Sequence, residues 1–238
     1  MKAGLRTIDR MRNTALDPQT TAPTTLWLIR HAEVDERYQS VFGGRIDMEL
    51  SPRGHQQSQA LARYLHGKPI DAIYSSPMKR VRQTLAPILT NGAPKPIVLE
   101  DLREVDFGDW TGLHWNEVNA KYGVSALEWL DQLERDGIPN AECTRSFRSR
   151  VEPCLRQVLL EQSGKQVAIA CHGGVIRMIL AILLDWPLPK LAAFEIDYAS
   201  LTHVVWHPPF VRLQLLNFSP WRECLDGALR HPSPTSAG

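Results

Sequence analysis

The sequence predicts an α/β fold in which short buried strands alternate with helices. Leu26–Ile29 is an unbroken apolar run, which is typical of a strand that is covered on both faces of a sheet. Asp71–Ser75 and Gln166–Cys171 are two further short strands, and a segment with helical spacing follows each of them. The chain has 238 residues, of which 43% are hydrophobic, so it is long enough for one or two domains with a substantial core.

Composition and charge exclude several classes of partner. The formal net charge is +1, so no overall field attracts nucleic acid or an anionic membrane. No apolar run approaches the roughly 18–20 residues that span a bilayer, and the N-terminus lacks the apolar segment of a signal peptide. The cysteines form no CxxC pair, which favours reduced thiols and a cytoplasmic location. We expect residues 1–24 to be a flexible extension, residues 25–220 the folded domain and residues 221–238 a C-terminal tail.

The first strand ends at Arg30 and His31. Side chains at the carboxyl end of such a strand point into the crevice where open α/β sheets bind ligands. A cation beside an imidazole suits an anion site that contains a nucleophile, although the dipeptide alone is equally compatible with a strand that ends at the surface. Gly43 and Gly44 follow, and they permit either a simple turn or the close approach of backbone to a ligand.

Two helices are expected after the first and second strands. Ser51 and Pro52 suit the N-cap and first position of one helix, and Ser76 and Pro77 suit the same positions of the other. Arg80 then falls in the first turn of the second helix. Because helix N-termini favour anions, an arginine there is out of place unless it serves an anion. The alternative is a solvated surface arginine.

The rest of the chain is predicted in less detail. We expect an edge strand at residues 94–99, an acidic and aromatic loop at Leu102–Trp110, and helices over residues 115–133 and 144–162, the latter bent at Pro153. The third buried strand ends at His172, and Gly173 begins the next turn. His172 alone is also compatible with a structural histidine. Strand-like segments follow at residues 193–198, 201–206 and 211–216.

Each of the three buried strands therefore delivers a candidate anion-binding residue at or just beyond its carboxyl end. These residues are Arg30 with His31, then Arg80, then His172. In a doubly wound sheet such strand ends share one edge, so we expect these side chains to converge.

The same residues resemble the motifs of the histidine phosphatase superfamily, which includes the cofactor-dependent phosphoglycerate mutases. The resemblance covers about residues 26–216 and implies a three-layer α/β/α fold with a mainly parallel central sheet. Four segments carry it in the family's order: Arg30–Glu33, Ser75–Thr84, Leu102–Trp110 and Cys171–Arg177. They are similar to the Arg-His-Gly signature, the second arginine motif, the acid-donor loop and the second-histidine motif.

The resemblance also implies roles for individual residues. His31 takes the phosphoryl group, and Glu104 protonates the leaving oxygen and then helps to activate water. The side chains implied to hold the phosphate oxygens are Arg30, Arg80 and His172. Arginine forks match phosphate oxygens, and we expect nearby cations to lower the pKa of His31 and keep it neutral and nucleophilic. No metal and no cofactor are implied.

Three positions near these motifs need separate comment. Ala32 stands where glycine is usual, and Arg37 stands where many relatives carry asparagine. Arg37 either contacts phosphate or substrate, or points into solvent. Gly44 matches the family's glycine near the phosphate, and Gly173 can expose its N–H group. Arg37, Gly44 and Gly173 are therefore our candidate substrate-binding residues.

The resemblance leaves three functions to compare. The first is a cytoplasmic phosphatase that acts on small phosphorylated metabolites through phosphorylated His31, with a homodimer as one assembly left open. The second is a phosphoglycerate mutase, but residues 111–164 lack the longer basic insert usual in the mutases. The third is a catalytically idle protein that binds phosphorylated ligands. Residues 107–115 also resemble the alpha-ribazole phosphatase branch. His203 and His207 lie at strand spacing, but no carboxylate cluster accompanies them as a metal site would require.

Overall fold

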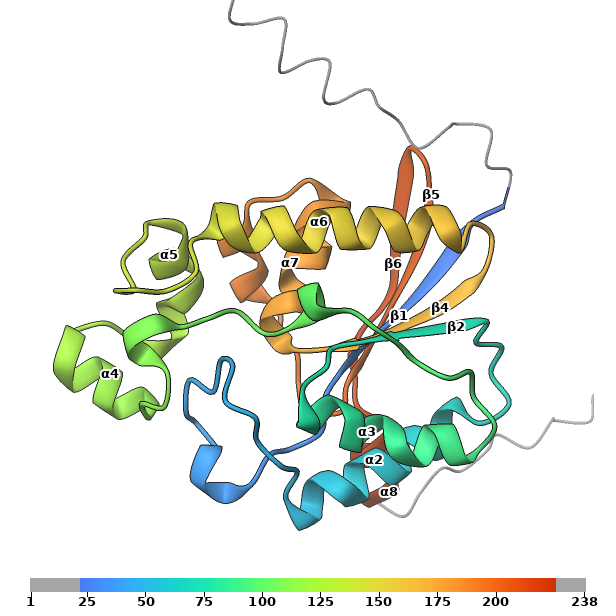
Figure 1. Ribbon diagram of the computed structural model, residues 1–238, viewed down its shortest axis with the longest axis horizontal. Helices are drawn as coiled ribbons and strands as arrows, with labels where there is room; N and C mark the ends of the chain where they lie inside the picture. The colour runs from blue at the N-terminus through green and yellow to red at the C-terminus, as the bar shows by residue number, and fades with distance from the viewer. Residues whose placement is uncertain (1–21, 226–238) are drawn as a thin grey trace, which may run out of the picture.

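A single six-stranded mixed sheet organises the computed structural model, which describes residues 22–225 (Figure 1). The strand order is β3-β2-β4-β1-β5-β6. The first four strands in this order are mutually parallel, whereas β5 pairs antiparallel with β1 and β6 pairs antiparallel with β5. This arrangement confirms the predicted α/β fold with a mainly parallel sheet. The strands are β1 (Thr24–Arg30), β2 (Ala72–Ser75), β3 (Ile97–Val98), β4 (Gln166–Cys171), β5 (Leu201–His207) and β6 (Phe210–Phe218).

Helices cover both faces of the sheet (Figure 1). One face carries α2 (Pro52–Leu65), α3 (Lys79–Thr90) and α8 (Pro220–Leu225). The other carries α6 (Thr144–Glu161) and α7 (Gly173–Leu184), which pack on each other. Two short helices, α4 (Trp115–Tyr122) and α5 (Trp129–Glu134), lie in the connection that leads to α6.

The central strand β1 is apolar throughout because both of its faces are buried. Leu26 and Leu28 belong to the core that includes α6 and α7 residues, whereas Trp27 and Ile29 belong to the core that includes α2 and α3 residues. Successive side chains of a strand point to opposite faces. One short apolar run therefore joins the two layers, and it carries Arg30 to the edge of the sheet.

The segment predicted as a strand at residues 193–198 is not a strand. It leaves a 3₁₀ helix, Leu188–Ala193, and continues as a loop. Its carbonyl groups do not pair with a neighbouring strand. Instead the carbonyl of Ile196 accepts from Arg30, and that of Phe194 accepts from Arg177.

Two helix predictions also need correction. Residues 115–133 do not form one largely continuous helix, because Gly123 ends α4 in the left-handed conformation at a φ of 66° and a 3₁₀ turn precedes α5. Ser76 and Pro77 do not begin α3, whose N-cap is Met78. Ser51 and Pro52 do begin α2 as predicted.

Both predicted boundaries of the folded domain, between residues 24 and 25 and between residues 220 and 221, fall inside elements of the structure. Thr24, assigned to the extension, is buried at the start of β1. Residues 221–225, assigned to the tail, belong to α8, which packs on α2. Residues 1–21 and 226–238 lie outside the described residues, so the rest of both predictions stands untested. Between residues 22 and 225 no helix is both long and apolar enough to cross a membrane.

Candidate active site

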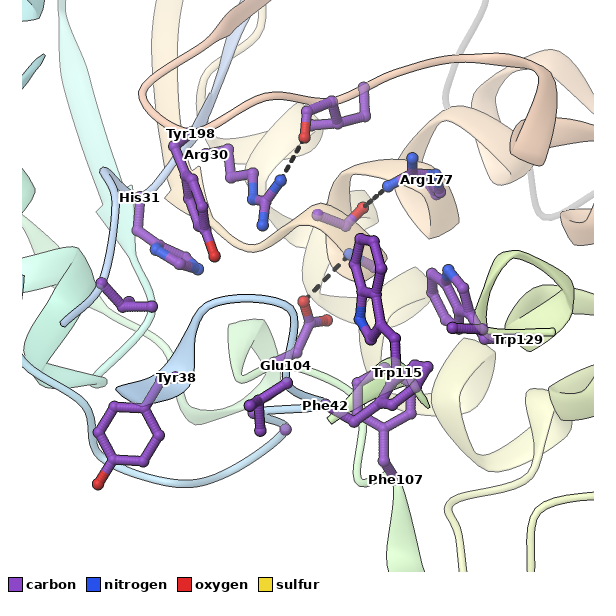
Figure 2. Close-up of a pocket in the computed structure, with 18 of the residues that line it drawn as sticks. Arg30, His31, Tyr38, Phe42, Glu104, Phe107, Trp115, Trp129, Arg177 and Tyr198 are labelled. Atoms are coloured by element: carbon purple, nitrogen blue, oxygen red, sulfur yellow. Dashed lines mark hydrogen bonds between the residues drawn. The ribbon is translucent and has the colours of Figure 1, made fainter. Parts of the chain in front are cut away.

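A cavity of about 370 Å³ opens at the edge of the sheet where β1 and β4 end. Its lining includes the basic residues and the carboxylate that the sequence singled out: Arg30, His31, Arg80 and Glu104. Figure 2 shows Arg30, His31 and Glu104 around this part of the cavity. Gly173 and Gly174, at the start of α7, complete this part of the wall. The structure therefore brings together residues that are up to about 140 positions apart.

His31 follows β1 directly and is buried. Its Nδ1 lies 2.8 Å from the carbonyl oxygen of Ala32. Because a carbonyl only accepts, Nδ1 carries the proton and the lone pair resides on Nε2. Burial lowers the pKa of His31 well below 6.5, and the charges of Arg80 and Arg30 lower it further. The ring is therefore neutral at pH 7, as expected, although burial contributes more than the cations we had named.

Arg80 joins the two histidines. Its Nε lies 3.2 Å from Nε2 of His31 and 3.2 Å from Nδ1 of His172. The two imidazole centroids are 5.2 Å apart. The remaining nitrogens donate to the carbonyls of Ile46 at 2.7 Å and Gly44 at 2.8 Å. Burial lowers the pKa of Arg80 to about 10, so the guanidinium still carries its charge at neutral pH.

His172 is fully buried and does not itself line the cavity. It lies behind Arg80, and its Nε2 is 2.8 Å from the hydroxyl of Ser76. This contact explains why Ser76 does not cap α3 as predicted. Burial, followed by the charge of Arg80, lowers the pKa of His172 well below 6.5.

Arg30 keeps a free donor at this edge of the sheet. Its Nη1 donates to the carbonyl of Ile196, and its guanidinium carbon lies 4.1 Å from the centroid of the Tyr198 ring. Its Nε is buried and has no hydrogen-bond partner among the described residues. A bound anion would satisfy this donor, since buried polar groups are normally paired.

Glu104 faces the cavity from a loop between β3 and α4. Its Oε2 accepts from the backbone N–H of Gly174 at 3.1 Å, and its Oε1 accepts from that of Val105 at 3.0 Å (Figure 2). A Cβ atom on residue 174 would lie 2.5 Å from Oε1. Glycine at this position therefore allows the carboxyl group to lie against the start of α7.

Arg150 of α6 fixes the backbone at Glu104 and just before it. Its Nη1 donates to the carbonyls of Asp101 and Arg103 at 2.6 and 2.7 Å, and its Nη2 donates to that of Glu104 at 3.2 Å. Its Nε lies 2.7 Å from Oε1 of Glu142, and both side chains are mostly buried. Sequence reasoning missed Arg150, which stands 46 positions from Glu104 and belongs to no motif we recognised.

The three candidate substrate-binding residues separate into two groups. Gly44 and Gly173 both line the cavity. Gly44 has a φ of +45°, and its carbonyl accepts from Arg80. Arg37 is not part of the lining, because its exposed guanidinium lies 3.3 Å from Asp35 and stacks on the ring of Tyr38. The structure therefore places Arg37 on the solvent side of this loop.

Arg177 and Tyr198 are among the polar residues of the lining that were not predicted. Arg177 donates to the carbonyls of Gly173 and Phe194 at 3.3 and 2.9 Å. Its place one helical turn after Gly173 was a usable signal. Tyr198 lies beside His31, with ring centroids 5.5 Å apart. It is the last residue of the segment mistaken for a strand, so the sequence offered no comparable signal for it.

The two histidines considered as a metal pair, His203 and His207, both lie on β5. His203 stacks on Trp27 with ring centroids 4.1 Å apart. Within residues 22–225 no group of three or more histidine, cysteine, aspartate or glutamate side chains is arranged to hold a metal ion.

Residues 26–219 match the sequence profile of the histidine phosphatase superfamily (branch 1). The chain belongs to this superfamily. The matched residues cover the whole described sheet except the first residues of β1. They include His31, Arg80 and His172, whose side chains the structure brings together.

Three relatives show the range of similar proteins. Phosphoserine phosphatase 1 of Hydrogenobacter thermophilus is 31% identical over 175 residues, which is 74% of this chain and 83% of the relative. The adenosylcobalamin/alpha-ribazole phosphatase of Escherichia coli K12 is 26% identical over 192 residues, which is 81% of this chain and 95% of the relative. The solved structure of a mycobacterial glucosyl-3-phosphoglycerate phosphatase superposes with a TM-score of 0.74 at 25% identity, covering 83% of this chain and 100% of that one.

Proposed function

We propose that the protein is a phosphatase that hydrolyses small phosphate monoesters through a phosphohistidine on Nε2 of His31. The observation that carries the proposal is the state of that imidazole. Its Nδ1 is tied to the Ala32 carbonyl, its pKa is lowered well below 6.5, and Nε2 lies beside Arg80. An unprotonated ring nitrogen next to a fixed cation is suited to attack the phosphorus atom of a phosphoryl group whose negative charge that cation stabilises.

The proposed reaction has two halves. In the first, Nε2 of His31 bonds to phosphorus, the bond from phosphorus to the ester oxygen breaks, and the Glu104 carboxyl group gives its proton to the leaving alcohol. In the second, the Glu104 carboxylate takes a proton from water, the water oxygen attacks the phosphorus, and His31 is released with inorganic phosphate. Arg30 and Arg80 balance the charge of the transferred group, with His172 behind Arg80.

The residue chemistry and the relatives support this proposal independently. Phosphoryl transfer asks a protein mainly for positioning and charge stabilisation, and the lining supplies two arginines next to the proposed nucleophile. The named relatives are phosphatases. Their names give different substrates, so the common feature carried over to this chain is phosphate release. The thiols of Cys143, Cys154 and Cys171 are free, which supports a reducing, cytoplasmic location.

His31→Ala tests the nucleophile. We expect it to abolish phosphate release from an aryl phosphate and to abolish the acid-labile phosphoryl label that the unaltered protein acquires in a rapid quench. His55→Ala, a change of an exposed histidine on α2, is the matched control and should keep both. A chelator should leave the rate unchanged. Full turnover by the His31 variant would rule the proposal out.

The same assays separate the two alternatives from a phosphatase. A mutase would convert 3-phosphoglycerate to 2-phosphoglycerate faster than it releases phosphate when bisphosphoglycerate is present. An idle binding protein would bind inorganic phosphate without turnover of any ester. Either result contradicts the proposed function.

A further inference from the structure

The cavity has two unlike halves. One half holds Arg30, Arg80 and His31. The other half is mainly apolar, and Figure 2 shows its rings gathered on the far side of Glu104 from His31, with Arg177 on the same side. The apolar residues of the lining include Val41, Phe42, Phe107, Trp115, Ala126, Leu127, Trp129 and Leu130. We call the rings of Phe42, Phe107, Trp115 and Trp129 the aromatic wall.

Packing fixes most of the aromatic wall before any ligand binds. Phe107 meets Phe42 edge to face, with centroids 4.9 Å apart. It also meets Trp129 nearly perpendicularly, with centroids 5.3 Å apart. Such edge-to-face contacts hold rings in place. The wall is therefore a formed surface that does not have to be assembled around a substrate.

Two large apolar side chains at the wall remain open to solvent. Trp115 is 44% exposed and Leu127 is 74% exposed. A single exposed apolar side chain is ordinary, but two that line the same cavity mark a surface that a ligand covers. Both residues belong to the connection between the acid loop and α6, so this connection forms the mouth of the cavity.

The position of Glu104 ties the aromatic wall to the leaving group. A Cβ atom built on Gly174 would lie 2.5 Å from Oε1 of Glu104 and 3.4 Å from Cη2 of Trp129. The edge of the Trp129 ring is therefore beside the carboxyl group. In the proposed reaction Glu104 gives its proton to the ester oxygen, so the first carbon atoms of the alcohol must lie next to Trp129.

The charged side chains near this half do not favour a charged alcohol. Arg177 directs its nitrogens to the carbonyls of Gly173, Leu191 and Phe194. The other charged side chains of the lining, apart from Arg30 and Arg80, are the carboxylates of Glu104 and Glu195. Glu104 must carry its proton when the ester binds, so an additional carboxylate on the alcohol would meet apolar rings, and the guanidinium of Arg177 is already directed to carbonyl groups.

We propose that the aromatic wall is the leaving-group subsite, and that it selects phosphate monoesters whose alcohol carries a flat, uncharged ring. This inference rests on the proposed phosphatase function. The cavity of about 370 Å³ falls within the usual size range of small-molecule sites, roughly 300–1,000 Å³, so a phosphoryl group and a ring system fit it together.

The decisive comparison is between 2-phenylethyl phosphate and ethyl phosphate. Their alcohols have similar acidity, so a difference in kcat/KM reports contacts with the leaving group and not intrinsic reactivity. We expect kcat/KM to be at least about tenfold higher for the phenylethyl ester, since apolar pockets discriminate added apolar groups by about 10–200-fold. Phosphoserine, whose alcohol carries charges, should be a poorer substrate than the phenylethyl ester.

Trp115→Ala should reduce this preference at least about threefold by removing an exposed ring that covers the substrate. Phe210→Ala is the matched control, because Phe210 is also exposed but lies on the β5–β6 hairpin, and it should leave the preference unchanged. Equal kcat/KM values for the two esters, or a preference that survives in the Trp115 variant, would overturn the subsite. Failure to hydrolyse either ester would instead overturn the phosphatase function, and this inference with it.

Discussion

The two buried histidines differ in what holds their second ring nitrogen. Nδ1 of His31 faces the carbonyl of Ala32, which can only accept, so one tautomer is fixed. Nε2 of His172 faces the hydroxyl of Ser76, which can donate or accept. His31 therefore presents the lone pair of Nε2 toward Arg80. Because the Nε–H of Arg80 can only donate, Nδ1 of His172 accepts from it, and Nε2 of His172 carries the proton and donates to Ser76. Both rings are therefore held in one neutral tautomer, and each directs a different unprotonated nitrogen at Arg80: Nε2 of His31 and Nδ1 of His172.

Glu104→Gln tests the proposed acid. The amide can still accept from the N–H of Gly174 but has no acidic proton to give. We expect kcat for an alkyl phosphate to fall by about 10²–10⁴-fold, the usual contribution of a general acid. Dinitrophenyl phosphate, whose leaving group departs without protonation, should lose much less in the first half of the reaction. Pre-steady-state release of the alcohol from each ester measures this difference, and equal losses for both esters would contradict the role.

At the scale of elements, the loop that carries Glu104 is held in place by contacts with Arg150 of α6. Arg150 donates to three of its carbonyl groups, and Glu142 orients Arg150. Glu142 also accepts from the N–H of Asp106 at 3.4 Å. The loop contains only isolated 3₁₀ turns, so these contacts replace the backbone ladder that would hold a strand.

Arg150→Met should therefore lower kcat in the same way as Glu104→Gln, but by a smaller factor. We expect kcat for an alkyl phosphate to fall by about 10–100-fold, because small misplacements of a catalytic group cost that much, with a smaller loss for dinitrophenyl phosphate. Arg156→Met, on the same helix and paired with Glu152 at the surface, should leave both rates unchanged. Arg150→Lys should restore part of the activity.

A change in folding alone would produce a different result. If the Arg150 variant lost activity equally for both esters, or in proportion to a lowered Tm, its role would be structural and the positioning effect would be refuted.

Local signals explain which features the sequence could predict. Arg30, His31 and Arg80 stand at or just after the ends of apolar runs, and strand ends share an edge whatever the rest of the chain does. Ser76 illustrates the limit, since the same Ser-Pro pattern that suits a helix cap here serves His172. Arg150 and Trp129 act through contacts made across the fold, which no spacing in the sequence reports.

At the scale of the whole molecule, the helices that cover both faces of the sheet also exclude water from the polar side chains of the site. The layers that bury β1 also bury His31, Arg80 and His172. Desolvation is the largest cause of the lowered pKa of each. The fold thus keeps the imidazoles uncharged beside a guanidinium, and in doing so it makes the stability of the whole domain depend on pH.

The sign of that dependence follows from linkage. The pKa of His31 and of His172 is lowered well below 6.5 in the folded protein, whereas the unfolded chain titrates near 6.5. Below pH 6.5 the unfolded state therefore binds protons that the folded state does not, and the free energy of unfolding must fall as the pH falls. Each ring contributes up to about 1.4 kcal/mol per pH unit until its own folded pKa is reached.

His172→Asn isolates one of these rings. In urea unfolding at pH 7, 6 and 5, this variant should be less stable at pH 7 because the packing and hydrogen bonds of His172 are altered, yet its stability should fall less steeply with acid. The slope should become shallower by up to about 1.4 kcal/mol per pH unit, the contribution of one proton. His55→Asn, a change of an exposed histidine, should keep the original slope. If the free energy of unfolding fell equally steeply with acid in the unaltered protein and in the His172 variant, His172 would have the same pKa in the folded and unfolded states. That result would contradict the lowered pKa of His172.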